Sequence, residues 1–165
     1  MKKAIKILIN LARLLLGAVF VFSGFVKAID PLGTSYKIKD YFEAFDWTFF
    51  SDLSLMMAVL LAATEFFLGA ALLLGIWKKT VSLLLLLFMS VVTPLTLYLA
   101  IKNPVTDCGC FGDALILTNW QTFFKNLVLL LLAIVVFFRN DKFYLFFGLN
   151  LITQYLLFQL RTPSR

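Results

Sequence analysis

Four runs of about twenty consecutive apolar residues constrain the fold of this chain more than any other feature. As an α-helix, a run of that length crosses the roughly 30 Å hydrocarbon core of a bilayer. The runs cover residues 7–26, 53–77, 81–101 and 120–138, and a fifth, more polar run covers 143–160. The sequence predicts an all-α polytopic membrane helix bundle, with a four-helix membrane domain over residues 1–140. A fifth transmembrane helix and a short tail follow over residues 141–165.

The composition agrees with a protein embedded in lipid and excludes several other classes. Hydrophobic residues make up 62% of the chain and charged residues 15%, whereas soluble domains are about half apolar and about a quarter charged. Histidine is absent, which excludes catalysis, haem ligation and zinc binding that depend on histidine. The net charge of +6 fits the basic residues that orient membrane proteins and calls for no nucleic acid as a partner.

The distribution of charged residues indicates how the spans are oriented. The loops 27–52 and 102–119 carry seven of the nine acidic residues, whereas basic residues flank the other ends of the spans, at Lys2, Lys3, Lys6, Lys78, Lys79, Arg139 and Lys142. Because basic loops stay in the cytoplasm, we expect an inside amino terminus and an outside cysteine loop in a bacterial inner membrane. We interpret the first span as a retained anchor; the alternative is a cleaved signal peptide.

The loop over residues 27–52 has two interpretations. It begins with the turn signal Asp30-Pro-Leu-Gly33 and continues with aromatic residues mixed with charges. One interpretation is a short helix whose aromatic residues lie among the lipid headgroups. The other is a cap that closes over a site between the membrane helices.

The first and second predicted spans each carry charged residues at membrane depth. On each span these charges lie on the same helical face as a series of small residues. Positions 13, 17, 20, 24 and 27 share one face of the first helix, and positions 58, 62, 65 and 69 share one face of the second. Small residues let helices approach closely in lipid, and charges there need a partner. We therefore predict that these faces pack together and that Arg13 pairs with Glu65. The pair either stabilises packing alone, or Glu65 titrates or contacts a ligand.

The segment Asp107-Cys-Gly-Cys-Phe-Gly-Asp113 contains the only two cysteines of the sequence, Cys108 and Cys110. Zinc and iron–sulfur sites need about four Cys or His ligands, so a metal site would require a second copy of the chain. Two unrelated buried cysteines are another alternative. The favoured interpretation is a catalytic redox dithiol, because Gly109 lets the backbone bend until the sulfurs can bond. A strained disulfide of this kind is labile and oxidising.

Groups near the cysteines are of the kind that stabilise a thiolate. Thr118-Asn-Trp-Gln121 is typical of a capping box that begins a helix. Lys125 lies about two turns into that helix, and Lys27 ends the first span on the same side of the membrane. Cations and helix amino termini lower the pKa of a thiol. The carboxylates of Asp107 and Asp113 oppose this effect, so the cations decide only if the loop folds back onto the bundle. We expect that it does, with one cysteine as the nucleophile and the other resolving it.

The chain resembles the DoxX-like and MauE group of small redox-associated membrane proteins over about residues 5 to 140. The matching stretches are Arg13-Leu-Leu-Leu-Gly17, Phe22-Ser-Gly-Phe-Val-Lys27 with Asp30-Pro31, Glu65-Phe-Phe-Leu-Gly69, Gly75 and Cys108-Gly-Cys-Phe-Gly112. Members of this group are often compared with vitamin K epoxide reductase and DsbB-type disulfide proteins. The Cys-x-Cys spacing departs from the Cys-x-x-Cys of vitamin K epoxide reductase-like enzymes.

The resemblance implies a membrane helper for disulfide formation or thiol redox chemistry outside the cytoplasm. For MauE it implies maturation of a disulfide-rich methylamine dehydrogenase subunit. For DoxX relatives it implies a link to thiosulfate:quinone oxidoreductase. A quinone cofactor is therefore suggested by the resemblance and by no residue of the sequence itself. We expect a thiol–disulfide redox protein in the lipid bilayer with a periplasmic or extracellular-side redox partner protein. The alternative is a non-catalytic assembly or anchor subunit of a redox complex.

Overall fold

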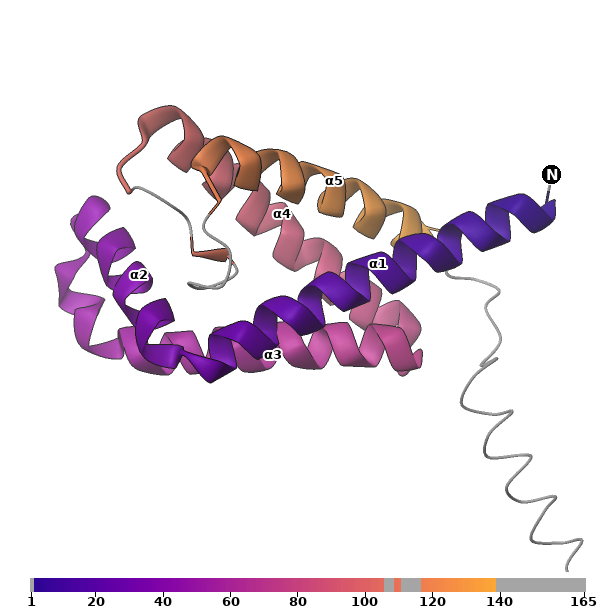
Figure 1. Ribbon diagram of the computed structural model, residues 1–165, viewed down its shortest axis with the longest axis horizontal. Helices are drawn as coiled ribbons and strands as arrows, with labels where there is room; N and C mark the ends of the chain where they lie inside the picture. Colours follow the sequence, from indigo (N-terminus) through magenta and orange to yellow (C-terminus); the bar gives the residue numbers. More distant parts are fainter. Residues whose placement is uncertain (1, 106–108, 111–116, 139–165) are drawn as a thin grey trace, which may run out of the picture.

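The computed structural model describes residues 2–105, 109–110 and 117–138 as a helix bundle (Figure 1). Its helices are α1 (Lys2–Ile29), α2 (Pro31–Ala44), the short 3-10 helix η1 (Thr48–Leu53), α3 (Ser54–Leu74), α4 (Lys78–Lys102) and α5 (Asn119–Phe138).

The described helices confirm the four predicted core spans. Four stretches are long and apolar enough to cross a membrane: Ile7–Ile29, Thr48–Leu74, Lys78–Lys102 and Asn119–Phe138. The protein is therefore an integral membrane helix bundle. The predicted fifth span, residues 143–160, lies outside the described residues.

Helices α1 and α3 form one closely packed antiparallel pair, as the two small-residue faces predicted. A Cβ atom placed on Gly24 would lie 2.4 Å from the backbone nitrogen of Phe66, and one on Gly69 would lie 2.6 Å from that of Val21. Only glycine allows this approach of the two backbones. The contact fixes the register in which residues of α1 face residues of α3.

Helices α4 and α5 form the second pair, which is held by polar side chains as well as by packing. The Asn126 side-chain amide of α5 donates to the Thr96 hydroxyl of α4 at 3.3 Å. Asn119 of α5 donates from Nδ2 to Asn103 Oδ1 at 2.7 Å and to the Val105 carbonyl at 2.8 Å. These bonds join the end of α4 to the beginning of α5.

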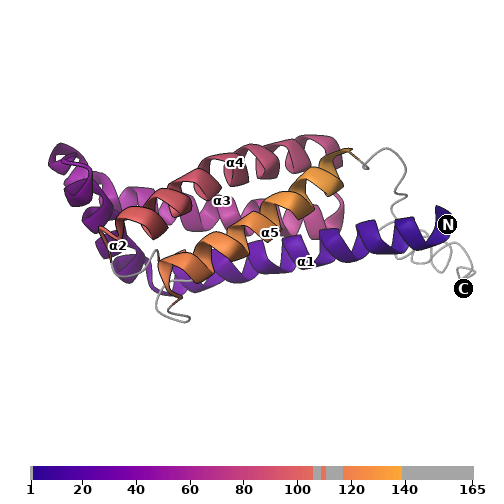
Figure 2. The ribbon, with the colours of Figure 1, turned by 90° about the horizontal axis from the view of Figure 1, so that it is seen from above.

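The bundle has two unlike ends. At one end, here called the hairpin end, α3 stops at Gly75, whose left-handed conformation (φ 72°) ends the helix before α4 begins. At the other, the capped end, α2 lies across the bundle (Figures 1 and 2). Helix α2 begins sharply because the Asp30 carboxylate accepts from the Gly33 backbone N–H at 2.9 Å and Pro31 occupies the first turn.

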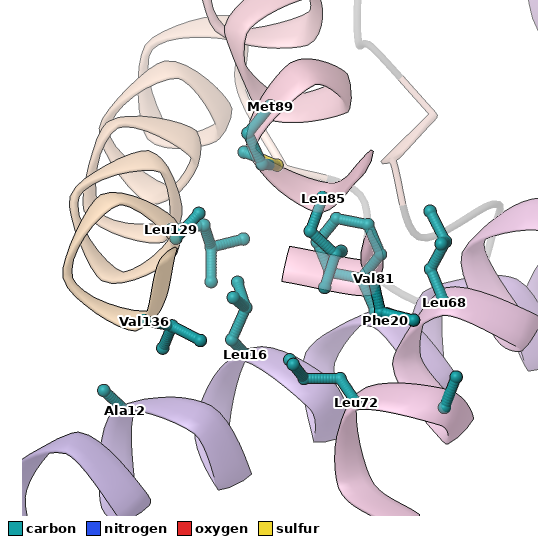
Figure 3. Packing of buried hydrophobic residues seen from close by; sticks show 12 residues of the cluster. Ala12, Leu16, Phe20, Leu68, Leu72, Val81, Leu85, Met89, Leu129 and Val136 are labelled. Carbon is teal, nitrogen blue, oxygen red and sulfur yellow. The ribbon is translucent and has the colours of Figure 1, made fainter. Parts of the chain in front are cut away.

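The hydrophobic core fills the hairpin half of the bundle. Leu16 and Phe20 of α1, Leu72 of α3, Leu85 of α4 and Leu129 of α5 are among its buried members (Figure 3). Away from their common turn α4 diverges from α3 (Figure 1). The capped half is therefore held less by a core than by α2, and this is where the candidate site lies.

Candidate functional site

A buried ion pair between α1 and α3 forms the centre of the site. Lys27 Nζ lies 2.6 Å from Glu65 Oε2, and the two side chains are only 3% and 9% exposed. The same ammonium donates to Ser23 Oγ at 2.7 Å and to the Cys110 carbonyl oxygen at 2.6 Å. An ammonium has three protons to donate, so these three acceptors satisfy Lys27 completely. We call Ser23, Lys27, Glu65 and the Cys110 carbonyl the Lys27 cluster.

The predicted pair of Arg13 with Glu65 is wrong, and the antiparallel register explains why. Arg13 lies about 21 Å along α1 from Lys27, at about 1.5 Å per residue, and donates from Nη2 to the Leu73 carbonyl at 3.2 Å. Its guanidinium also lies 3.6 Å from the Cβ position of Gly75, at the hairpin end. Because α1 and α3 run in opposite directions, later positions of α1 face earlier positions of α3. In this register Lys27 lies beside Glu65, and Arg13 lies beside Leu73.

The described part of the cysteine loop lies back against the bundle, as expected from the sequence. The Cys110 carbonyl accepts a second bond, from Ser23 Oγ at 2.6 Å. Gly109 has φ +58°, and a Cβ atom there would lie 2.9 Å from Lys37 Cγ of α2. Glycine at this position therefore allows both the backbone turn and the contact with α2. Cys108 lies outside the described residues.

Lys125 of α5 lines a cavity next to the described part of the cysteine loop. With Cys110, Glu65, Ser23 and Asn126 it lines a small cavity of about 40 Å³. This volume is enough for about three water molecules at 10–15 Å³ each. Two predicted cationic side chains, Lys27 and Lys125, therefore both lie beside Cys110.

The predicted capping box at the start of α5 is confirmed. The Gln121 side-chain oxygen accepts from the Thr118 backbone N–H at 3.1 Å, and Thr118 Oγ1 accepts from the Gln121 N–H at 3.3 Å. Reciprocal bonds of this kind satisfy two donors that a helix start leaves unpaired. They place the beginning of α5 at the capped end, where Lys125 reaches the small cavity.

A larger cavity of about 460 Å³ lies next to the Lys27 cluster. Its walls come from α1, α2, α3, α4 and the cysteine loop, and they are mainly apolar. Helix α2 contributes Thr34, Lys37, Ile38, Tyr41 and Phe42 to these walls, and its Ser35 hydroxyl lies 2.8 Å from that of Ser54 on α3. Of the two interpretations of residues 27–52, the structure therefore favours the cap.

The cavity, and not a metal centre, is the feature with room for a bound group. Within residues 2–105, 109–110 and 117–138 no three His, Cys, Asp or Glu side chains are placed to hold a metal ion. Cavities of about 300–1,000 Å³ with mostly apolar walls and a few converging polar groups are typical of small-molecule sites.

Sequence reasoning missed the roles of Ser23 and Asn126. Ser23 is one turn before Lys27 on the same face of α1, and that spacing is the signal that could have found it. Asn126 interrupts an apolar run, which also marks a residue facing the bundle interior.

Comparison with family models gives one result that covers most of the chain. The model described as methylamine utilisation protein MauE matches residues 5–139. The chain belongs to the MauE family. The match includes all the described membrane helices, both cysteines and every residue of the Lys27 cluster. Comparison with curated proteins and with solved structures finds no match.

Membership of the MauE family of methylamine utilisation proteins, together with the four apolar helices, supports an accessory role in a membrane. The relation to DoxX, vitamin K epoxide reductase and DsbB-type proteins rests on the sequence stretches quoted above.

Proposed function

We propose that this MauE-family protein carries out thiol–disulfide exchange outside the cytoplasm, with Cys108 and Cys110 as its redox pair. The observation that supports this most is the position of the Cys110 carbonyl, which two buried side chains, Lys27 and Ser23, each hold at 2.6 Å. Buried charges within a membrane are costly and usually functional. Here they fix the backbone of one cysteine of a Cys-Gly-Cys segment.

The proposed reaction is an exchange that conserves electrons. A thiolate of a partner protein attacks one sulfur of the Cys108–Cys110 disulfide and forms a mixed disulfide, releasing the other cysteine as a thiolate. The partner's second thiolate then attacks the mixed disulfide. The partner gains a disulfide, and the Cys108–Cys110 pair gains the two electrons and two protons that the partner loses. Run in reverse, the same steps reduce a partner disulfide.

Two features of the site support this role for the cysteines. Lys27, which binds the Cys110 carbonyl at 2.6 Å, and Lys125, which lines the small cavity together with Cys110, are cations of the kind that stabilise a thiolate. The start of α5 lies at the same end of the bundle and adds its positive helix end.

The proposed orientation follows from the two ends of the bundle. Lys78 and Lys79 lie at the hairpin end with Arg13, and we place this end in the cytoplasm of a bacterial inner membrane. The capped end, with α2 and Cys110, then faces the oxidising side, where disulfides persist. A redox partner on that side would approach the cysteine loop directly.

Alkylation of the two cysteines tests the proposal against the alternative of a non-catalytic assembly or anchor subunit. The chain has two cysteines only, so mass-tagging of acid-quenched membranes reads the redox state of this pair alone. We expect an oxidised form that reductant converts to a doubly tagged form. Of Cys108→Ser and Cys110→Ser, the variant that lacks the resolving cysteine should trap a reductant-sensitive adduct with a partner, whereas the variant that lacks the nucleophile and the double variant should trap none.

The opposite result would support the assembly subunit. In that case both cysteines stay reduced under an added thiol oxidant, and neither single variant forms an adduct. A double Cys→Ser variant that inserts normally and supports the partner's maturation as well as wild type would also overturn the redox proposal.

A further inference from the structure

Glu65 lies beside Cys110 in a way that the exchange reaction itself does not use. Among the described residues, the small cavity of about 40 Å³ and the larger one of about 460 Å³ share four wall residues: Glu65, Cys110, Phe88 and Val92. Two of these four carry groups that titrate, a carboxyl and a thiol. The carboxyl and the thiol therefore adjoin the same two buried spaces.

The ammonium group of Lys27 lies between this carboxylate and the cysteine. It is 2.6 Å from Glu65 Oε2 and 2.6 Å from the Cys110 carbonyl oxygen, and its third proton goes to Ser23. The contact with Glu65 joins opposite charges, whereas the contact with Cys110 is to a neutral carbonyl oxygen. A thiolate at Cys110 would therefore be a second anion beside this one ammonium.

The other titratable groups in the described walls are cations or neutral. Lys125 of α5 lines the small cavity, and Lys37 and Tyr41 of α2 line the larger one, whereas α4 contributes uncharged residues to both. Because the Glu65 side chain is only 9% exposed, salt and water screen its charge weakly. Of the charged groups in these described walls, Glu65 is the one that opposes a thiolate at Cys110.

We propose that Glu65 controls the reactivity of Cys110 by competing with its thiolate for the positive charge of Lys27. A charged Glu65 offsets the attraction between Lys27 and the sulfur, and it also repels a thiolate directly. With a neutral side chain at position 65, the charge of Lys27 acts on the sulfur without this opposition, so the thiolate becomes more stable. Glu65 acts on the sulfur through charge and takes no part in the exchange of bonds.

The consequence for redox chemistry rests on the proposed function. A disulfide is a stronger oxidant when its reduced form is stabilised. With Glu65 charged, the Cys108–Cys110 disulfide is therefore a weaker oxidant than the neighbouring lysines alone would make it. The carboxylate sets how readily the pair takes electrons from a partner.

The pH dependence of alkylation tests this control without a partner. In a Cys108→Ser background Cys110 is the only thiol, so the rate of its reaction with iodoacetamide against pH gives its pKa. Glu65→Gln, which keeps an oxygen for Lys27, should lower this pKa by about one unit. Asp52→Asn is the matched control, because Asp52 is an exposed carboxylate that lines neither cavity, and it should leave the pKa unchanged.

A second substitution separates an effect of charge from a loosened loop. Adding Lys27→Met to Glu65→Gln removes the cation that favours the thiolate, and it also removes the bond to the Cys110 carbonyl. If the charge of Lys27 causes the fall in pKa, this double variant should reverse most of it. A fall that persists or grows in the double variant would overturn the proposal, as would an unchanged pKa in Glu65→Gln.

A further comparison decides the matter if Glu65→Gln does not fold. Lys27→Met alone keeps the Glu65 carboxylate, and the double variant lacks it. The pKa of Cys110 should therefore be higher in Lys27→Met than in the double variant. Equal values would overturn the control by Glu65.

Equilibration with glutathione extends the test to the redox pair and keeps the two proposals apart. In the chain with both cysteines, Glu65→Gln should raise the equilibrium constant for reduction of the disulfide by up to about tenfold, the factor that one pKa unit represents. A pair that forms no disulfide would refute the redox function and leave the alkylation result standing. A working disulfide with the same equilibrium constant in both chains would refute control of its oxidising power by Glu65.

Discussion

The ammonium group of Lys27 lies 2.6 Å from the backbone carbonyl oxygen of Cys110, which is 83 residues further along the chain. Because Lys27 also binds Glu65, a buried ion pair between two membrane helices and a loop outside them belong to one hydrogen-bonded unit. A change in the ion pair therefore reaches the cysteine loop.

Replacing Glu65 by Ala should destabilise the protein strongly. The substitution leaves the Lys27 ammonium buried without its counter-charge, and breaking a buried pair from one side costs about 3–5 kcal/mol. The double change Lys27→Met with Glu65→Met should recover part of that loss, since it removes both charges. Thermal unfolding in detergent, followed by size-exclusion chromatography, measures both effects.

Arg13 supplies the matched control for this pairing. Arg13 lies at the hairpin end and bonds Leu73, so Arg13→Leu and Glu65→Ala should add within about 0.5 kcal/mol, as separated sites do. Rescue of Glu65→Ala by Arg13→Leu, with no rescue by Lys27→Met, would contradict the pair in the structure.

Replacing Ser23 by Ala should loosen the cysteine loop. Ser23 donates to the Cys110 carbonyl, and one such bond contributes about 1 kcal/mol, or about a fivefold change in an opening equilibrium. In a Cys108→Ser background, maleimide should therefore alkylate Cys110 about five times faster. Ser90→Ala is the control, since that hydroxyl bonds the Leu86 carbonyl of its own helix. Equal alkylation rates in the two variants would show that the loop is held by other contacts.

The fold was largely predictable because hydrocarbon imposes simple rules on a chain. Twenty apolar residues form a spanning helix whatever their order, and small residues at helical spacing indicate which helices pack closely. The α1–α3 contact through Gly24 and Gly69 follows from those rules. The divergence of α4 from α3 does not, because it depends on side-chain volumes summed over the whole hairpin half.

The residues of the candidate site could be predicted from the sequence, but the partner of Glu65 could not. A polar or reactive residue in an apolar stretch can be recognised from its own position in the sequence, and this applies to Lys27, Glu65, Lys125 and Cys110. Which cation meets Glu65 depends on the register of two antiparallel helices, and the close contact at Gly24 sets that register in three dimensions. The cavity likewise arises from helices that are distant in sequence.

Replacing Gly24 by Ala should separate α1 from α3. The new Cβ atom would lie 2.4 Å from the Phe66 backbone nitrogen and 2.7 Å from the Ala62 carbonyl oxygen, and backbone atoms cannot move aside as a flexible side chain can. Overpacking costs about 1–3 kcal/mol, so thermal unfolding should occur at a lower temperature. Val59→Ala, on the lipid-facing side of α3, should have a much smaller effect. An unchanged unfolding temperature for Gly24→Ala would mean that the helices are not in close contact.

Cysteine labelling in sealed cells should show the capped end outside. In a Cys108→Ser, Cys110→Ser background, Tyr36→Cys introduces an exposed thiol on α2, and Lys78→Cys introduces one at the hairpin end. An impermeant maleimide should label the first in intact cells and the second only after lysis. The reverse pattern would place the cysteine loop in the cytoplasm and remove the oxidising surroundings on which the proposed exchange depends.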